Sequence, residues 1–171
     1  HHRTPYTWDK ERVSSYIRYV DTDNQSHWLF DSFLFLEIMD TGTGGANKMF
    51  AKGYNLESAN QADWTKLIDY YFQSETGIGA LDASVKEASA ILGTPRQKRQ
   101  IVISIPEPIV YQHPEQASSS TKYWGKIDNQ TLDFSNSADR IKACKWYIDQ
   151  VRAKFNEKNY QHVELAGFYW L

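Results

Sequence analysis

The chain has 171 residues, 41% hydrophobic and 15% aromatic, which is enough for one domain with a substantial core and too few for two ordinary domains. Nineteen Lys and Arg residues against 21 Asp and Glu residues give a formal net charge of -2, and no run of like charges stands out. Because nucleic-acid binding depends on a concentrated basic face, this composition argues against nucleic acid as a partner.

Cys144 is the only cysteine, which excludes a disulfide framework and a thiolate zinc site. No apolar stretch approaches the roughly 20 residues of a membrane span, and the first residues lack the charged and apolar regions of a signal peptide. His1 and His2 have the pattern of a tag or a processing remnant and carry no functional assignment. We therefore expect residues 1–171 to form one domain without a membrane span.

In chain order, the helix-like segment Asp9–Arg12 is followed by Tyr16–Val20, which has strand composition. Phe33–Ile38 is nearly continuous in apolar residues, the pattern of a strand covered on both faces. A long insertion, Asp40–Ala59, follows this strand. Its glycine-rich run Gly42–Gly45 favours a flexible loop over a phosphate-binding loop, because no helix pattern begins there.

Two amphipathic helix patterns come next in the chain. Their apolar faces carry Trp64, Leu67, Ile68, Tyr71 and Phe72 in the first, and Ile78, Leu81, Val85, Ala88 and Leu92 in the second. Gly93 and Pro95 predict the end of the second helix. Ile101–Ile105 then predicts another buried strand.

A second long insertion, Pro106–Ser135, follows this strand. The helix after it is predicted by apolar residues at spacings of three and four, with Ser137 as its N-cap. These apolar residues are Ile141, Cys144, Ile148, Val151 and Phe155. The chain then reaches Val163–Leu171, which has the pattern of a final buried strand.

This alternation of strands and helices predicts an α/β fold with a parallel sheet and crossover helices. The sheet belongs either to an open doubly wound fold or to part of a (β/α) barrel. Both long insertions follow the carboxyl ends of predicted strands, where the ligand-binding loops of α/β proteins collect.

Four carboxylates stand at or just past these strand ends: Asp21, Glu37, Asp40 and Glu107. In a barrel they would point toward one shared mouth, where glycosidic bond cleavage needs one carboxyl group as proton donor and another as base or nucleophile. Glu107 lies between two prolines that fix its backbone. Each carboxylate also has a structural interpretation as a cap or turn residue, and Asp21 fits a polar turn better than a calcium loop.

Aromatic residues form a second group of candidate ligand contacts. Tyr111 and Trp124 lie in the later insertion, and Tyr169 and Trp170 end the last strand. The apolar C–H faces of sugar rings stack on aromatic planes, while polar loop residues bond the hydroxyl groups. Trp124, next to a glycine in a Ser-rich loop, is the best candidate for a stacking platform.

Other kinds of chemistry have little support in the sequence. His27, His113 and His162 have no metal-ligand spacing, and no Ser lies in a nucleophile-elbow motif. We expect neither a metal nor a cofactor.

Several strings carry a family resemblance: Trp28–Leu36, Ile105–Pro106, Tyr123–Gly125 with Leu132–Ser135, Trp146–Asp149 and Leu165–Leu171. Together they resemble an uncharacterised bacterial domain family, common in Bacteroidetes and in gut or soil bacteria. Its members look like secreted (β/α)-barrel proteins related to glycoside hydrolases. The resemblance implies that residues 1–171 form the N-terminal half of a (β/α)8 TIM barrel. It also implies a carbohydrate partner and a secreted, periplasmic or cell-surface location.

Half a barrel has a physical consequence, because it leaves two open sheet edges that a closed barrel lacks. We expect the remainder of the barrel from further residues or from another chain. Three functions compete: a glycoside hydrolase, a non-catalytic glycan-binding module of the same fold, and a nucleotide or small-molecule protein of the doubly wound type. The third needs a phosphate loop, and the first needs two carboxyl groups roughly 5 to 9.5 Å apart.

Overall fold

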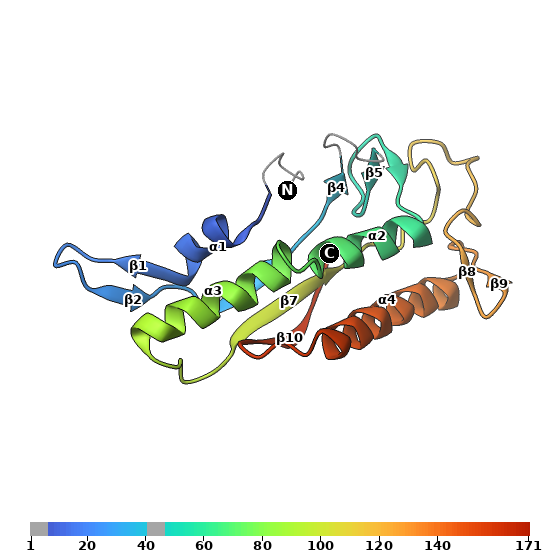
Figure 1. Ribbon diagram of the computed structural model, residues 1–171. Coiled ribbons are helices and arrows are strands. Elements are labelled where there is room, and N and C mark those ends of the chain that lie inside the picture. The colour runs from blue at the N-terminus through green and yellow to red at the C-terminus, as the bar shows by residue number, and fades with distance from the viewer. Residues whose placement is uncertain (1–6, 41–46) are drawn as a thin grey trace.

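A computed structural model describes residues 7–40 and 47–171 and has a mixed α/β architecture (Figure 1). The run Gly42–Gly45, predicted to be a flexible loop, lies outside the described residues. The described residues form four helices and four small sheets, one of them parallel throughout. The predicted α/β class and parallel sheet are therefore confirmed.

The central sheet consists of β3 (Ser32–Phe35), β7 (Arg99–Ile105) and β10 (Val163–Trp170). All pairings are parallel, and the strand order is β10-β7-β3. The order of these three strands across the sheet is therefore the reverse of their order in the chain, with no strand skipped. The two later predicted strands are confirmed. Among the described residues, β3 and β10 pair only with β7 and thus form the edges of this sheet.

β3 is shorter than the predicted strand Phe33–Ile38. The Ile38 carbonyl accepts hydrogen bonds from the backbone N–H groups of Phe50 (2.7 Å) and Ala51 (3.2 Å), and Met39 pairs with Met49 in a different sheet. Pairing with the following insertion thus draws the chain away from the central sheet after Phe35. A run of apolar residues reports burial but not the sheet in which each residue pairs.

The helices are α1 (Lys10–Ile17), α2 (Gln61–Tyr71), α3 (Gly77–Leu92) and α4 (Ser137–Lys158). The last three confirm the predicted helices. α2 begins with a capping box between Asn60 and Asp63, and α3 ends at Gly93, whose φ of 78° favours glycine. The cap of α4 is Asn136, one residue before the predicted cap, and its side chain accepts a hydrogen bond from the Ala138 N–H (3.0 Å).

The predicted strand Tyr16–Val20 is only partly right. α1 continues to Ile17, and only Arg18–Val20 forms a strand, β1, which pairs antiparallel with β2 (Ser26–Trp28). Val13 and Ile17 are both buried and lie one helical turn apart. Burial of this stripe outweighs the strand preference of aromatic and β-branched residues.

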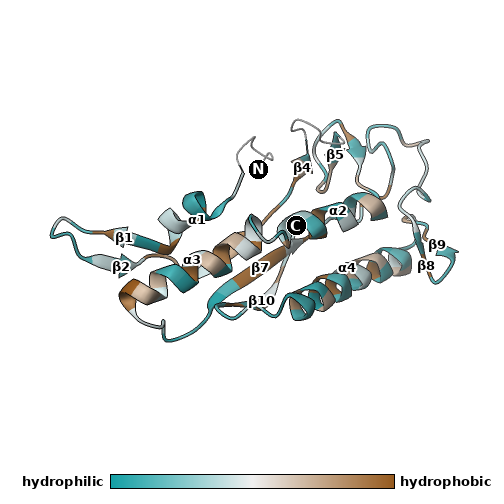
Figure 2. Cartoon of the chain, viewed as in Figure 1, coloured by the Kyte–Doolittle hydropathy of each residue, from teal (hydrophilic) through white to brown (hydrophobic). Residues whose placement is uncertain are grey.

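α2 and α4 cover the same face of the central sheet. The Phe35 ring of β3 contacts Tyr71 of α2 edge to face, with centroids 5.5 Å apart. The Arg152 guanidinium of α4 lies over the Phe168 ring of β10 at 5.8 Å. Because Phe35 and Phe168 are both in register with Ile103, their side chains point to one face. The main core lies there, and Figure 2 shows most of β7 in the colour of hydrophobic residues.

The opposite face of the sheet is much less covered. Leu34 and Tyr169 point to it and are each 48% exposed. Val102, in register with Leu34, is half-buried, whereas Ile101 and Ile103 on the helix-covered face are fully buried. One face of this parallel sheet is therefore a core, and the other is a partly exposed face that mixes apolar residues such as Leu34 with polar ones such as Gln100 and Ser104.

Candidate functional site

The first insertion forms a small sheet beyond the carboxyl end of β3. It contains β4 (Met39–Asp40), β5 (Lys48–Met49) and β6 (Glu57–Ser58). β4 pairs antiparallel with β5, and β5 pairs parallel with β6. Figure 1 shows this sheet at the same end of the molecule as the loop that follows β7.

Backbone and side-chain hydrogen bonds join the second insertion to this small sheet. The Ser58 N–H donates to the Gln112 carbonyl (2.8 Å), and the Ser58 hydroxyl donates to the Tyr111 carbonyl (2.8 Å). Within the second insertion, the Tyr123 hydroxyl donates to the Ile109 carbonyl (2.7 Å), and burial raises the pKa of Tyr123 above its usual value. The two insertions therefore form one preformed rim at the carboxyl edge of the central sheet.

Glu37 and Glu107 approach this rim from neighbouring strands. Glu37 follows β3 and is only 3% exposed, and Glu107 follows β7. The Glu107 carboxylate accepts a hydrogen bond from the Lys52 N–H (2.6 Å), and its own N–H donates to the Phe50 carbonyl (2.7 Å). Phe50 also donates to Ile38, the residue after Glu37, so one segment of the first insertion contacts both strand ends.

Asp40 lies one step further into the rim. It is 9% exposed and in register with Lys48 of β5. The Lys48 ammonium group forms an ion pair with Glu57 (2.7 Å), and Glu57 also accepts a hydrogen bond from the Gln112 side chain (2.9 Å). These bonds, that of Lys48 above all, lower the pKa of Glu57. The sequence did not point to Lys48 and Glu57. The insertion that carries them has no alternation of polar and apolar residues from which strand pairing could be predicted.

Two of the predicted aromatic residues are exposed at the same edge. Tyr169 is 48% exposed and Trp170 is 62% exposed, and as consecutive strand residues they point to opposite faces. Trp170 is in register with Ile105, two residues before Glu107. Tyr111, in the rim, is half-buried. The structure thus brings Tyr169 and Trp170 to the edge that carries the strand-end carboxylates.

Trp124 corrects the prediction of a stacking platform. It is 1% exposed, and its ring contacts Trp64 (5.2 Å), Phe134 (5.5 Å) and Trp146 (5.5 Å) between centroids. The Trp124 carbonyl also accepts a hydrogen bond from the Gln61 N–H at the start of α2 (2.8 Å). Polar neighbours in the sequence predicted exposure, but the loop folds back and buries this ring between α2 and α4.

Asp21 also corrects the sequence prediction, because it does not share the mouth with the other carboxylates. It lies in the turn of the β1–β2 hairpin and accepts hydrogen bonds from the N–H groups of Gln25 (2.8 Å) and Asp23 (3.0 Å). Its second oxygen contacts the His27 ring nitrogen at 2.6 Å. The bonds to Gln25 and His27 lower the pKa of Asp21. These contacts make Asp21 a turn residue.

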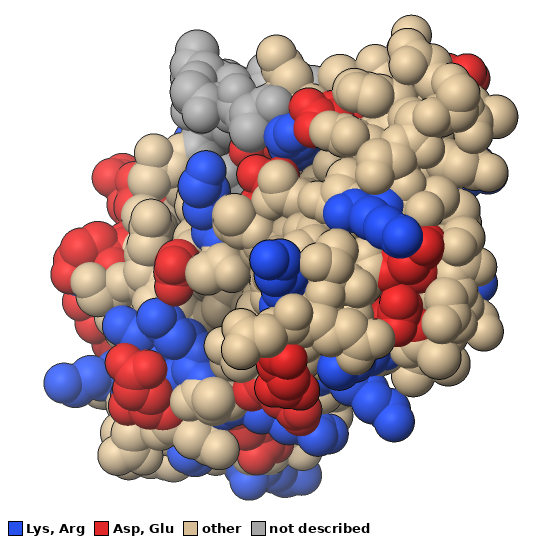
Figure 3. All heavy atoms as spheres, turned by 90° about the vertical axis from the view of Figure 1, so that its right-hand side faces the viewer, with Lys and Arg blue, Asp and Glu red and all other residues tan. Residues whose placement is uncertain are grey.

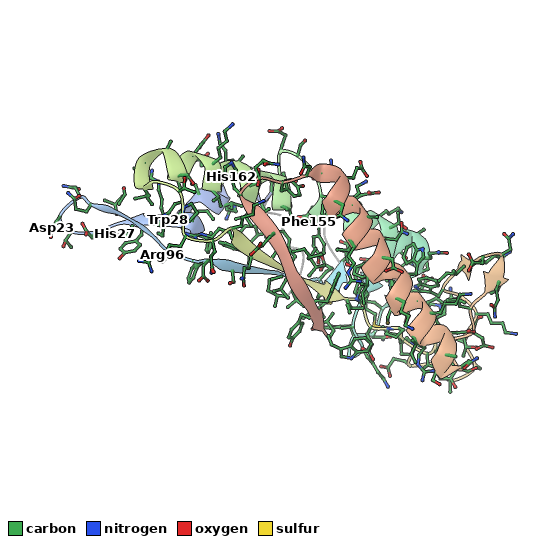
Figure 4. All side chains as sticks on the ribbon, turned by 90° about the horizontal axis from the view of Figure 1, so that it is seen from below. Asp23, His27, Trp28, Arg96, Phe155 and His162 are labelled. Carbon is green, nitrogen blue, oxygen red and sulfur yellow. The ribbon has the colours of Figure 1, made fainter. Side chains whose placement is uncertain are left out.

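The hairpin lies at the amino edge of the central sheet. Trp28, at its end, lies beneath the guanidinium of Arg99, the first residue of β7, at 4.3 Å. Figure 4 shows Asp23 and His27 at the tip of the hairpin, which projects away from the rest of the chain. Asp21 is therefore excluded from the candidate site at the carboxyl edge.

A hollow of about 450 Å³ lies elsewhere, between the junction of α2 and α3 and the helix α4. Its lining includes Phe72 and Glu75 near the junction of α2 and α3, and Lys154 and Lys158 of α4. Lys154 forms an ion pair with Asp69 (3.1 Å), which also lines the hollow. This open hollow has none of the strand-end residues that sequence reasoning identified.

The rim and the strand ends together offer carboxylates, aromatic rings and a preformed loop at one edge of a parallel sheet.

Among the described residues, no helix combines the length and hydropathy needed to cross a membrane. Searches of curated proteins and of solved structures found no match to the chain. A family model, the domain of unknown function DUF4855, matches residues 1–171, and the chain belongs to this family.

Proposed function

We propose that this domain binds a polysaccharide at the carboxyl edge of its parallel sheet and acts as part of a glycoside hydrolase-like protein. The observation that carries the proposal is the meeting of both insertions with Glu37, Glu107 and the exposed aromatics Tyr169 and Trp170 at one edge. Exposed aromatic rings suit the C–H faces of sugars, and polar groups of the rim suit their hydroxyl groups.

For the reaction we propose the paired-carboxyl chemistry of glycoside hydrolysis. One carboxylic acid protonates the leaving oxygen, and a second carboxylate acts as nucleophile or as base toward water. Glu37 and Asp40 on the β3 side and Glu107 on the β7 side are the candidates from this chain. Such a protein would need no resident metal for this step.

We also propose that the sheet belongs to a (β/α)8 barrel of bacterial, Bacteroidetes type. Three parallel strands in chain order, with α2 and α4 on one face, support this arrangement. Exposed Leu34 and Tyr169 on the other face would then point into the barrel, and the edges of β3 and β10 would receive further strands. A polymeric glycan substrate would place the protein outside the cytosol, as a secreted, periplasmic or cell-surface protein.

A second candidate is a non-catalytic glycan-binding module of the same fold. The hydrogen bond from the Lys52 N–H to the Glu107 carboxylate favours it, because this carboxylate already holds the rim in place. A binding module would keep the aromatic residues of the edge and would not depend on Glu37, Asp40 or Glu107 for turnover.

A glycan array on the full-length protein, followed by product analysis on the glycans that bind, tests the proposal. Single substitutions Glu37→Gln, Asp40→Asn and Glu107→Gln separate the two candidates. A hydrolase predicts a loss of turnover of about a hundredfold or more in at least one variant with binding retained. Binding without products in the wild type supports the module, and a protein that binds no glycan overturns both.

A further inference from the structure

We propose, resting on the function proposed above, that the glycan bound at the carboxyl edge is electrically neutral. The inference concerns residues 108–121, called here the rim loop. Among Asp, Glu, Lys and Arg, this loop contains only Glu115. Figure 3 shows the end of the molecule that carries the loop, where a broad area with few charged side chains covers the upper right, with an acidic group at its margin.

Charges that border the rim loop are engaged with one another or with backbone. Lys48 and Glu57 form an ion pair (2.7 Å), and the Glu107 carboxylate accepts the Lys52 N–H (2.6 Å). Lys122, just after the loop, lies 3.8 Å from the Asp133 carboxylate. Opposite charges in the Lys48–Glu57 and Lys122–Asp133 pairs largely cancel at the distance of a ligand, whereas Glu107, bonded to a neutral N–H, keeps its negative charge. The border of the loop therefore has little positive field with which to attract an anionic group.

Apart from Glu115, the exposed polar side chains of the rim loop are neutral. Gln116 and Ser118 are exposed, and their side chains make no hydrogen bond to any other described residue. The backbone around them is fixed, because the Gln116 N–H donates to the His113 carbonyl (2.8 Å) and the Ser119 N–H donates to the Gln116 carbonyl (2.9 Å). An amide and a hydroxyl on a fixed backbone suit sugar hydroxyls and reduce the ordering cost of binding.

A glycan that carries carboxylate or sulfate groups would require a different loop. Recognition of these anions uses Arg or Lys side chains, often in bidentate geometry, and residues 108–121 contain neither. Two exposed cations border the loop: Lys122, directly after it, and Lys52, whose backbone rather than ammonium group bonds Glu107. Because Lys122 lies 3.8 Å from the Asp133 carboxylate, Lys52 is the bordering cation on which an anionic ligand would depend most.

The test measures binding of the full-length protein to immobilised neutral polysaccharides (mannan, xylan, β-glucan) and charged ones (polygalacturonate, heparin). We expect binding to a neutral polymer, with a Kd that changes by less than about twofold between about 0.05 and 0.5 M NaCl. The double variant Gln116→Ala/Ser118→Ala is expected to bind about 5- to 10-fold more weakly, as for two lost hydrogen bonds. Gln150→Ala is the matched control, because Gln150 is exposed on α4. Lys52→Ala is a second variant. Neither substitution is expected to change the Kd for the neutral polymer.

The outcomes separate this inference from the function on which it rests. Binding only to charged polymers, weakened by salt and by Lys52→Ala, overturns the neutral ligand and keeps the glycan function. If a neutral polymer binds with the same Kd in wild type and in Gln116→Ala/Ser118→Ala, the rim loop does not contact the glycan, and that part of the inference is overturned. Binding to none of the polymers overturns the glycan function, and the neutral ligand with it.

Discussion

At the residue scale, the buried tryptophan pair between α2 and α4 is the clearest energetic feature. Trp64 and Trp124 are 0% and 1% exposed and contact each other edge to face. We predict that Trp124→Ala lowers the free energy of unfolding by about 3–5 kcal/mol, the usual effect of removing a buried tryptophan side chain. Urea denaturation followed by circular dichroism checks it.

Trp170→Ala is the control for this substitution. Because Trp170 is 62% exposed, its removal should change the free energy of unfolding by less than about 0.5 kcal/mol. Equal, small effects of both substitutions would contradict the burial of Trp124.

Asp133 gives a prediction about pH. Hydrogen bonds from the hydroxyls of Ser135 and Thr121 lower the pKa of Asp133 from its ordinary 3.8 to about 2. Since the folded pKa lies below the unfolded one, the stabilisation is complete above the unfolded value and is lost as the pH falls toward 2. Asp133→Asn should therefore lower the Tm near neutral pH, and thermal melts in acid should show this difference shrinking.

A Tm difference between wild type and Asp133→Asn that stays constant from neutral pH to about pH 2 would contradict this account. The Asn variant keeps the size of the side chain, and its amide oxygen can still accept hydrogen bonds from Thr121 and Ser135. The experiment therefore reports the charge of Asp133 rather than a change in packing.

Single residues were the least predictable part of the site. Glu107, Tyr169 and Trp170 lie at the ends of β7 and β10, as the apolar runs before them indicated. Glu37 also follows a strand, but β3 ends earlier than the apolar run predicted. Trp124 was not predictable in this way, since its burial depends on side chains far away in the chain.

At the element scale, the rim depends on buried hydrogen bonds within and between its two insertions. Tyr123→Phe removes the hydroxyl that bonds the Ile109 carbonyl and should cost about 0.5–1.5 kcal/mol in unfolding free energy. We also expect faster amide hydrogen exchange over residues 108–121, because the loop loses one of its attachments. Hydrogen exchange with mass spectrometry measures this directly.

Tyr111→Phe is the matched control, since its hydroxyl makes no hydrogen bond to any other described residue. Exchange over residues 108–121 should stay at the wild-type rate in that variant. Equal acceleration in both variants, or in neither, would be inconsistent with a rim fixed by Tyr123.

Elements with a strong helical period were predictable from the sequence, and short pairings were not. α2, α3 and α4 follow from stripes of apolar residues with caps, which are local signals. β4, β5 and β6 are each two residues long and pair through an insertion without alternation, so no local pattern reveals them. The same pairings explain why β3 ends at Phe35.

At the scale of the whole molecule, the uncovered sheet face bears on the proposed barrel. Leu34 is 48% exposed within residues 1–171 but would point inward in a closed barrel. We predict that Leu34→Lys changes the stability of isolated 1–171 by less than about 1 kcal/mol. In the full-length protein it should cost more than about 3 kcal/mol, because a buried charge would lack a partner.

Ile141→Lys, on the outer surface of α4 at 56% exposure, is the control and should be tolerated in both proteins. Chemical denaturation of the four variants gives the comparison. Should Leu34→Lys be harmless in the full-length protein as well, the uncovered face would not be the inside of a barrel.

The carboxyl edge of the parallel sheet is the glycan-binding site proposed for the whole molecule. The most direct measurement is the Kd of the full-length protein for the glycan with the strongest array signal, in wild type, Tyr169→Ala and Tyr19→Ala. Tyr19 is 45% exposed on the distant hairpin and matches the 48% exposure of Tyr169. We predict a loss of about tenfold for Tyr169→Ala and an unchanged Kd for Tyr19→Ala. Equal affinities in all three proteins would contradict the claim.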